Sequence, residues 1–214
     1  MNYCGIDEAG RGSVMGPLVV AIVRTDSDGD LMSMGVKDSK KLTPHRREVL
    51  YEKIFGNYET EFLEVSAEEI DSLRKKMSLN EIELDMFAEA VGKLPSGLVY
   101  ADCPDVNTSA FSSRLSRKCG NRFKIVAEHK ADDKYPVVSA ASIVAKVIRD
   151  RRIKEISEEF GESVGSGYPS DRVTMDFIER WIKEKGVPPP NTRCSWESVR
   201  NLTTLAANTK ISDW

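Results

Sequence analysis

A strand, a glycine turn and a second strand in the first 25 residues constrain the fold more than any other feature. Apolar residues near the start run into Asp7 and Glu8, a Gly-Arg-Gly turn follows at 10–12, and residues 17–25 form another apolar stretch. Carboxylates are preferred ligands of Mg²⁺ and Mn²⁺, and glycines beside an arginine let backbone and guanidinium approach an anion together. The pattern indicates phosphodiester chemistry, whereas an isolated acid pair would more simply be a solvated strand end.

Elements further along the chain alternate between strands and helices, which predicts an α/β protein with a mixed sheet flanked by helices. Thr43 before Pro44 is typical of a helix start, Ser66 opens a capping box, and Asp28-Gly29 predicts a turn or hairpin. The expected strands are residues 3–7, 17–25, 59–65, 98–101 and 122–126. The expected helices are residues 43–54, 66–75, 78–91, 107–118, 137–160, 170–184 and 195–207.

The length of 214 residues allows one substantial core with a small appendage. Three prolines at 188–190 are the clearest break in the chain, so we expect a main domain over 1–187 and a helical tail over 188–214 docked on it. No apolar run reaches about 18 residues, and the start lacks a secretory pattern, so we expect no membrane span. Four scattered cysteines without a CxxC pair argue against a zinc site or disulfide scaffold, and for reduced thiols in the cytoplasm.

The distribution of charge bears on nucleic acid as a partner more than the net charge of −3 does. Basic residues gather in 37–47 and 112–154, whereas residues 59–89 are strongly acidic. Such segregation can create one basic and one acidic face, although a charge run on a helix is more often a solvated face. Composition therefore permits a nucleic-acid partner without requiring one.

Carboxylates stand at the ends of three separate predicted elements. Asp7 and Glu8 close the first strand, Asp102 closes the strand at 98–101, and Asp132 precedes the long helix. Convergence of these four would suit two divalent ions about 4 Å apart, one activating water and one stabilising the leaving oxygen. Each acid alone could instead be a helix cap or a solvated loop acid. That simpler reading is favoured for Asp105, Asp133 and Asp150.

Five sequence blocks lie in the order found in one nuclease family. They are GIDEAGRG (5–12), DSKKL (38–42), YAD (100–102), KADDKYPVVSAAS (130–142) and GSGYP (165–169). In these blocks the chain resembles type 2 ribonuclease H (ribonuclease HII) in its archaeal form, which is similar to the catalytic subunit of the eukaryotic enzyme. The resemblance implies a ribonuclease H-like catalytic domain with a five-stranded mixed sheet, flanking helices and a helical C-terminal extension.

The resemblance also implies an activity and a cofactor. It implies an endonuclease that cuts the RNA strand of RNA–DNA hybrids and cuts at single ribonucleotides embedded in duplex DNA. It implies two divalent ions, Mg²⁺ or Mn²⁺, with 5′-phosphate and 3′-hydroxyl ends as products. The catalytic and metal-binding residues would be Asp7, Glu8, Asp102 and Asp132, with Asp7 the best candidate to bridge both ions.

Discrimination of RNA from DNA requires recognition of the 2′-hydroxyl, which both donates and accepts hydrogen bonds. Backbone at residues 10–12 can approach that group because glycine has no Cβ. The resemblance implies that this loop and Tyr168 make the contact, and that Tyr168 also stacks on the sugar of the following nucleotide.

Further contacts are expected with the phosphate backbone of the substrate. The lysine pair at 40–41 reads as phosphate ligands or as a plain surface helix, with the two readings about even. Two serines open the long helix, whose N-terminal amides favour anions, and Lys146 and Arg149 share a face with Ser142. The predicted substrate-binding residues are Gly10, Arg11, Gly12, Lys40, Lys41, Ser139, Ser142, Lys146 and Tyr168.

Two alternative functions stay open. A type 3 ribonuclease H would cut long hybrids but act little at single ribonucleotides, and the closeness of the acid pair to Met1 argues against its extra N-terminal domain. A catalytically silent nucleic-acid-binding subunit is disfavoured because all four carboxylates are present. The expected partners are RNA–DNA hybrids and ribonucleotide-containing DNA duplexes, with a monomeric chain and no membrane. Residues 210–214 (KISDW) faintly resemble a motif for a replication clamp.

Overall fold

The computed structural model describes residues 2–36, 42–94 and 97–212. Its strands are β1 (Tyr3–Ala9), β2 (Leu18–Thr25), β3 (Glu59–Val65), β4 (Leu98–Asp102) and β5 (Lys124–Glu128). Its helices are α1 (Asp28–Met34), α2 (Pro44–Asn57), α3 (Ala67–Leu73), α4 (Leu79–Lys93), α5 (Thr108–Lys118), α6 (Ala131–Lys134), α7 (Pro136–Phe160), α8 (Arg172–Lys185) and α9 (Glu197–Ser212).

The chain forms two compact units. The sheet unit comprises Met1–Ala9, Val19–Glu64 and Ser78–Ile148, and the loop unit comprises Gly10–Leu18, Val65–Met77 and Arg149–Trp214. This division differs from the expected boundary near residue 187, because three separate segments contribute to each unit. The expectation of a tail over 188–214 docked on a domain over 1–187 stays a prediction.

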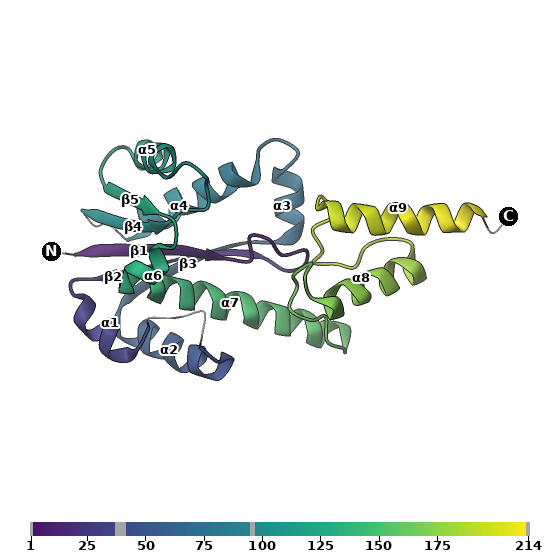
Figure 1. Cartoon of the computed structure of the whole chain (residues 1–214), viewed down its shortest axis with the longest axis horizontal. Helices are drawn as coiled ribbons and strands as arrows, with labels where there is room; N and C mark the ends of the chain where they lie inside the picture. The colour runs from purple at the N-terminus through teal and green to yellow at the C-terminus, as the bar shows by residue number, and fades with distance from the viewer. Residues whose placement is uncertain (1, 37–41, 95–96, 213–214) are drawn as a thin grey trace. The chain divides into compact units, whose positions relative to one another are not determined.

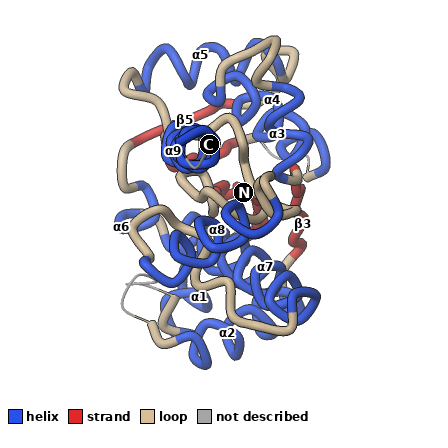
Figure 2. Tube along the Cα trace, turned by 90° about the vertical axis from the view of Figure 1, so that its right-hand side faces the viewer, coloured by secondary structure: helices blue, strands red, loops and turns tan. Residues whose placement is uncertain are grey.

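The sheet unit is built around one five-stranded mixed sheet in the order β3-β2-β1-β4-β5. β1 runs antiparallel to β2 and parallel to β4, and β4 runs parallel to β5. α4 and α5 lie on one side of the sheet, and α1, α2 and the first part of α7 lie on the other (Figure 1). β3 and β5 form the two edges, as the view in Figure 2 shows. The predicted mixed sheet with flanking helices is confirmed.

The core beneath the sheet packs α7 against β1 and β2. Val19, Ala21 and Val23 of β2 pack with apolar residues of α7 such as Val138 and Ile143, all fully buried. At Gly5, a Cβ would collide with the backbone of Val137. Glycine therefore lets the first turn of α7 lie directly against β1, two residues before Asp7.

Local signals at helix starts act as expected. The Thr43 hydroxyl accepts a hydrogen bond from the Arg46 N–H at 3.2 Å, with Pro44 at the first helical position. Ser66 and Glu69 form the predicted capping box at α3. Such caps satisfy N–H groups that the helix itself cannot.

One predicted turn is a helix instead. The turn or hairpin expected at Asp28-Gly29 is wrong, because α1 begins at Asp28. The Ser27 side chain caps its start by accepting from the Gly29 N–H, and Gly35 ends it with a φ of 77°. The fully buried Leu31 packs the helix against the core. Tertiary burial thus outweighs the local turn preference.

The loop unit has its own apolar core. Val14 and Met15 pack with Phe177 and Ile178 of α8 and Val199 of α9. Two backbone N–H groups, of Cys194 and Ser195, donate to the Asp71 carboxylate at 2.6 and 3.0 Å. The segment around 194 is therefore tied to α3 within this unit.

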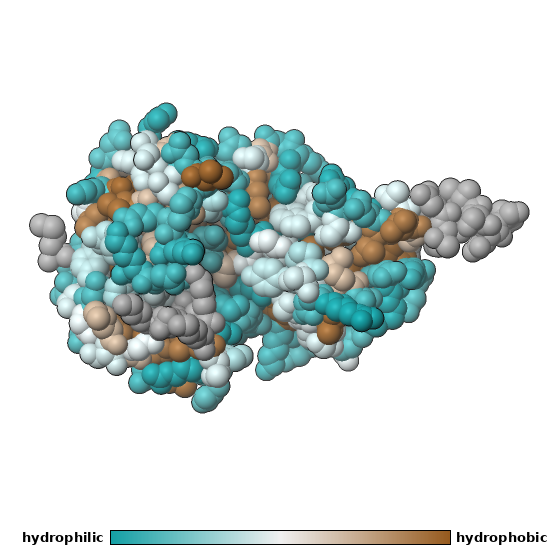
Figure 3. All heavy atoms as spheres, viewed as in Figure 1, coloured by the Kyte–Doolittle hydropathy of each residue, from teal (hydrophilic) through white to brown (hydrophobic). Residues whose placement is uncertain are grey.

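Surface and redox features are those of an ordinary globular protein. Figure 3 shows a largely hydrophilic face with hydrophobic side chains in small separate areas. The four cysteines, all of them described, form no disulfide. Among the described residues, no helix combines the length and apolar character that crossing a membrane requires.

Candidate active site

Of the two predicted acids at the end of β1, Asp7 is the more buried. It lies in the second half of the strand, is only 5% exposed, and accepts a hydrogen bond from the Glu8 N–H at 2.8 Å. Burial raises the pKa of Asp7 well above its ordinary value, and the negative charges of Glu8 and Asp102 raise it further. Hydrogen bonds from Ser142 and the Glu8 N–H oppose this shift. The first three predicted ligands therefore lie close enough to repel one another.

Strand register brings Asp102 to this place. β4 pairs in parallel with β1, with Ala101 beside Ile6. The carboxyl ends of the two strands therefore lie side by side. The Asp102 carboxylate accepts a hydrogen bond from the Ala131 N–H at 2.7 Å. That bond ties the end of β4 to the residue that precedes Asp132.

Asp132 is carried by the short helix α6, which the sequence did not predict. Lys130 adopts a left-handed conformation with a φ of 56°, and this turns the chain from β5 into α6. Asp132 itself is 4% exposed, and its carbonyl accepts a hydrogen bond from the Ser139 hydroxyl. Lysine is an unusual residue for this conformation, so the turn depends on the surrounding tertiary contacts.

The carboxylates suit a divalent cation chemically, although they are not gathered around one point. Among the described residues, no group of three or more Asp, Glu, His or Cys side chains is arranged to hold a metal ion. The raised pKa of Asp7 nevertheless arises from burial together with neighbouring negative charge. A cation would offset both causes, so the donor set fits a hard metal.

The serines and lysines predicted to bind substrate have different surroundings. Ser142 hydrogen-bonds the Asp7 carboxylate, and the buried Ser139 donates to Asp132. Lys146 of α7 is half-buried. Their contacts with substrate stay predictions. Lys40 and Lys41 lie outside the described residues.

The Gly-Arg-Gly turn belongs to the loop unit. Gly10 has a φ of +86°, and a Cβ there would lie 2.5 Å from the Pro17 carbonyl oxygen. Gly12 has an ordinary φ, and a Cβ there would meet nothing within 4 Å. The positive φ and the nearby Pro17 carbonyl thus require glycine at position 10. Position 12 is open, and a ligand could approach its backbone closely.

Tyr168 lies in a second loop that is bound to the first. The N–H groups of Val14 and Met15 donate to the Gly167 carbonyl at 2.8 and 3.1 Å. Gly167 has a φ of +80°, and a Cβ there would lie 2.7 Å from the Met15 carbonyl oxygen. Two segments separated by about 150 residues, both predicted to contact the 2′-hydroxyl, are therefore neighbours within the loop unit.

Two buried arginines in this unit were not predicted to hold the loops. Arg149 was expected to face substrate with Lys146, but it is 1% exposed. Arg193, which is fully buried, donates to the carbonyls of Arg11 and Gly16. Arg149 follows Val147 and Ile148 in an apolar run, which is the one sequence signal that could have indicated burial.

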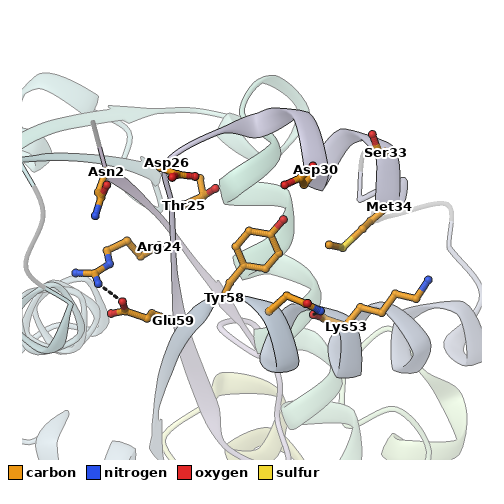
Figure 4. Close-up of a pocket in the computed structure, with 11 residues that line it drawn as sticks. Asn2, Arg24, Thr25, Asp26, Asp30, Ser33, Met34, Lys53, Tyr58 and Glu59 are labelled. Carbon is orange, nitrogen blue, oxygen red and sulfur yellow. Dashed lines mark hydrogen bonds and ion pairs between the residues drawn. The ribbon is translucent and has the colours of Figure 1, made fainter.

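A pocket of about 720 Å³ in the sheet unit lies at the other end of β1 and β2 (Figure 4). The Arg24–Glu59 ion pair and the acids Asp26 and Asp30 line it, and Tyr58 lies among them. Burial and these two acids raise the pKa of Tyr58. Arg24 pairs with Cys4 in the β ladder, three positions before Asp7, so this pocket contains none of the predicted site residues.

Comparisons with known proteins agree on one family. The family model described as Ribonuclease HII matches residues 4–199. Ribonuclease HII of Pyrococcus furiosus is 46% identical over 207 residues, which cover 94% of this chain and 91% of that protein. The crystal structure of ribonuclease H2 from Pyrococcus horikoshii OT3 superposes with a TM-score of 0.90 at 40% identity, over 97% of this chain and 99% of that one.

A second solved structure is a complex. It contains ribonuclease HII of Archaeoglobus fulgidus with PCNA, and its ribonuclease matches with a TM-score of 0.88 and 45% identity, over 94% of this chain and 96% of that one. The five-stranded mixed sheet with flanking helices is thus a ribonuclease H-like fold. This chain belongs to the ribonuclease HII family and is an endoribonuclease of the ribonuclease H class.

Proposed function

We propose that this endoribonuclease cuts the RNA strand of RNA–DNA hybrids and also cuts at single ribonucleotides embedded in duplex DNA. The products are a 5′-phosphate and a 3′-hydroxyl end. The observation that carries the chemistry is the burial of Asp7 beside Glu8 and Asp102, which raises the Asp7 pKa. A protein keeps such repelling acids together where function requires them.

Asp7, Glu8, Asp102 and Asp132 are proposed to hold two divalent ions, Mg²⁺ or Mn²⁺. Two such ions supply activation of the attacking water and stabilisation of the leaving oxygen. The division of ligands between them is left open, with Asp7 as the bridging candidate. Metal binding alone does not identify the substrate.

Hydrogen bonds to the acids support this role. Ser142 and the Glu8 N–H orient the Asp7 carboxylate, and the Ala131 N–H orients Asp102. The two bonds to Asp7 also favour its ionised form, which is the form that binds a cation. Ser139 donates to the backbone carbonyl of Asp132 and not to its carboxylate, and the contacts of Ser139 and Ser142 with substrate stay predictions.

Recognition of the ribose is assigned to the loop unit. The backbone at Gly10, Arg11 and Gly12, together with the Tyr168 hydroxyl, would bind the 2′-hydroxyl. Open space at Gly12 and the bonding between the two loops support this assignment. Lys40, Lys41 and Lys146 are proposed to contact phosphates, which position a duplex without reading its sequence.

Cleavage of a DNA duplex with one embedded ribonucleotide tests the proposal. We expect a cut beside the ribonucleotide with Mg²⁺ or Mn²⁺, and none after chelation or when that residue is a deoxyribonucleotide. A long RNA–DNA hybrid is the parallel substrate. Cleavage of the hybrid without cleavage of the single-ribonucleotide duplex would contradict the finer assignment and favour a type 3 activity.

A replication clamp is proposed as a partner, supported by the PCNA complex of the Archaeoglobus fulgidus relative. The segment of interest is 210–214, of which Asp213 and Trp214 lie outside the described residues. Trp214→Ala should weaken co-elution with a clamp in gel filtration, and the same experiment would report whether the enzyme alone is monomeric. A cytoplasmic location is likewise proposed, in keeping with the four thiols.

A further inference from the structure

Arg149 holds an unusual position for a cation. It lies within α7, its side chain is 1% exposed, and it is among the largest fully buried side chains described in this structure. Its Nη1 is 3.2 Å from the Asp150 carboxylate, whose own side chain is 36% exposed. Its other described acceptors are neutral, so one partly exposed carboxylate is the ion-pair partner described for this buried charge.

The guanidinium contacts both recognition loops at once. Nη2 donates to the Ser13 hydroxyl at 3.0 Å and to the Ser166 carbonyl. The guanidinium carbon lies 4.3 Å from the centre of the Tyr168 ring, a cation–π distance. Ser13 directly follows the Gly-Arg-Gly turn, and Ser166 and Tyr168 belong to the second loop. One planar, five-donor group therefore joins the two segments.

The glycines of both loops make room for this side chain. A Cβ at Gly167 would lie 2.8 Å from Arg149 Nη2, and a Cβ at Gly10 would lie 3.4 Å from Arg149 Cγ. Both glycines also have positive φ angles. The two loops are thus shaped around the arginine as well as around each other.

We propose that Arg149 is a positioning residue that holds Tyr168 and the Gly-Arg-Gly loop as one reader of the ribose. Its loss should lower discrimination for single ribonucleotides through Tyr168, and should affect long hybrids less. This inference rests on the proposed role of Tyr168 in contacting the 2′-hydroxyl. It goes beyond that role by naming the group that sets the tyrosine's position.

Arg193 supplies a matched control within the same unit. It is also fully buried and also donates to the first loop, at the carbonyls of Arg11 and Gly16. Its aromatic partner is Trp196, at 4.9 Å, and not Tyr168. Loss of Arg193 should therefore disturb the first loop without acting through the tyrosine.

The experiment is a double-mutant cycle on substrate preference. Arg149→Lys and Arg193→Lys are each made alone and together with Tyr168→Phe, and the ratio of kcat/KM for the single-ribonucleotide duplex to that for a long hybrid is measured. We expect Arg149→Lys to lower this ratio about tenfold alone but less than about threefold beside Tyr168→Phe, because coupled residues are non-additive. Arg193→Lys should lower it equally in both backgrounds.

Each outcome has a separate meaning. If Tyr168→Phe lowers the ratio but Arg149→Lys is additive with it, or Arg193→Lys is equally coupled, the positioning role is overturned while the proposed function stands. If Tyr168→Phe leaves the ratio unchanged, the reading role of the tyrosine fails and the inference fails with it.

A milder variant covers the case in which Arg149→Lys does not fold, as judged by urea unfolding. Ser13→Ala removes one acceptor of Arg149 and little volume. It should lower the same ratio by about twofold to threefold alone, and less beside Tyr168→Phe. A folded Ser13→Ala variant with an unchanged or additive ratio would overturn the proposal.

Discussion

The two units hold their functional groups by opposite electrostatic means. In the sheet unit, the buried Asp7 lies near the half-buried acids Glu8 and Asp102, and burial and repulsion raise the pKa of Asp7. In the loop unit, hydrogen bonds from the Ser166 and Val173 N–H groups lower the pKa of Asp171, and buried arginines brace loops through neutral acceptors. A cation would offset the repulsion in the first region, whereas the second is braced by hydrogen bonds among its own residues. The proposed chemistry and the proposed recognition thus have separate structural supports.

The largest expected effect is the loss of cleavage in Asp7→Asn. Removing a proposed ligand of both ions should lower the cleavage rate by about a thousandfold or more. The thermal midpoint without metal should stay equal or rise, because a buried repelling charge is removed. Asp133→Asn, at an exposed acid of the same region, is the control for both readouts. Near-normal turnover in Asp7→Asn would remove the acid from the site.

Backbone requirements distinguish two glycines of the same turn. Gly10→Ala should destabilise the fold by about 2–4 kcal/mol, because the positive φ and the Pro17 carbonyl both oppose a Cβ. Gly12→Ala should change stability by less than about 0.5 kcal/mol, since a Cβ there meets no atom. Urea unfolding measures both, and equal losses would show that the loop is held by something other than Gly10.

Tyr168→Phe removes a hydroxyl while keeping the ring on Arg149. Cleavage at a single ribonucleotide should fall about tenfold more than cleavage of a long hybrid, because the hybrid offers many alternative positions for cutting. Steady-state measurement of kcat/KM on the two substrates tests this difference. Equal losses on both would count against the role of the tyrosine in reading the ribose.

A smaller loss of stability is expected at Asp171, which caps the start of α8. Asp171→Ala should cost about 1 kcal/mol at neutral pH through loss of the cap. Because the folded pKa is lowered, the charge stabilises the fold above the unfolded value of about 3.9, and this contribution is lost as the pH falls through the folded pKa. The wild type and the variant should therefore converge in acid. A gap in unfolding free energy that persists below that pH would assign the effect to packing.

Periodicity and local chemistry were enough for most of the fold. The capping box at Ser66 and the helix start at Pro44 depend on residues a few positions apart, so they act before any tertiary contact forms. α1 was missed because a Ser27 cap and burial of Leu31 outweigh a turn signal. α6 was missed because it follows a lysine in a left-handed conformation that the surrounding structure imposes.

For the site, the sequence by itself indicated the residues that we propose carry the chemistry: adjacent acids after an apolar strand, two further acids, and a glycine-flanked arginine. Those features depend on residue type and short spacing, and the five sequence blocks in which they lie indicated the family. Tertiary structure alone decided that Asp102 meets Asp7 and Glu8, that Ser142 supports Asp7, and that Arg149 joins two loops. The contacts of Asp7 with Asp102 and Ser142, and that of Arg149 with Ser13, join residues about 95 to 135 positions apart. Strand register and burial bring them together, and neither can be read from local pattern.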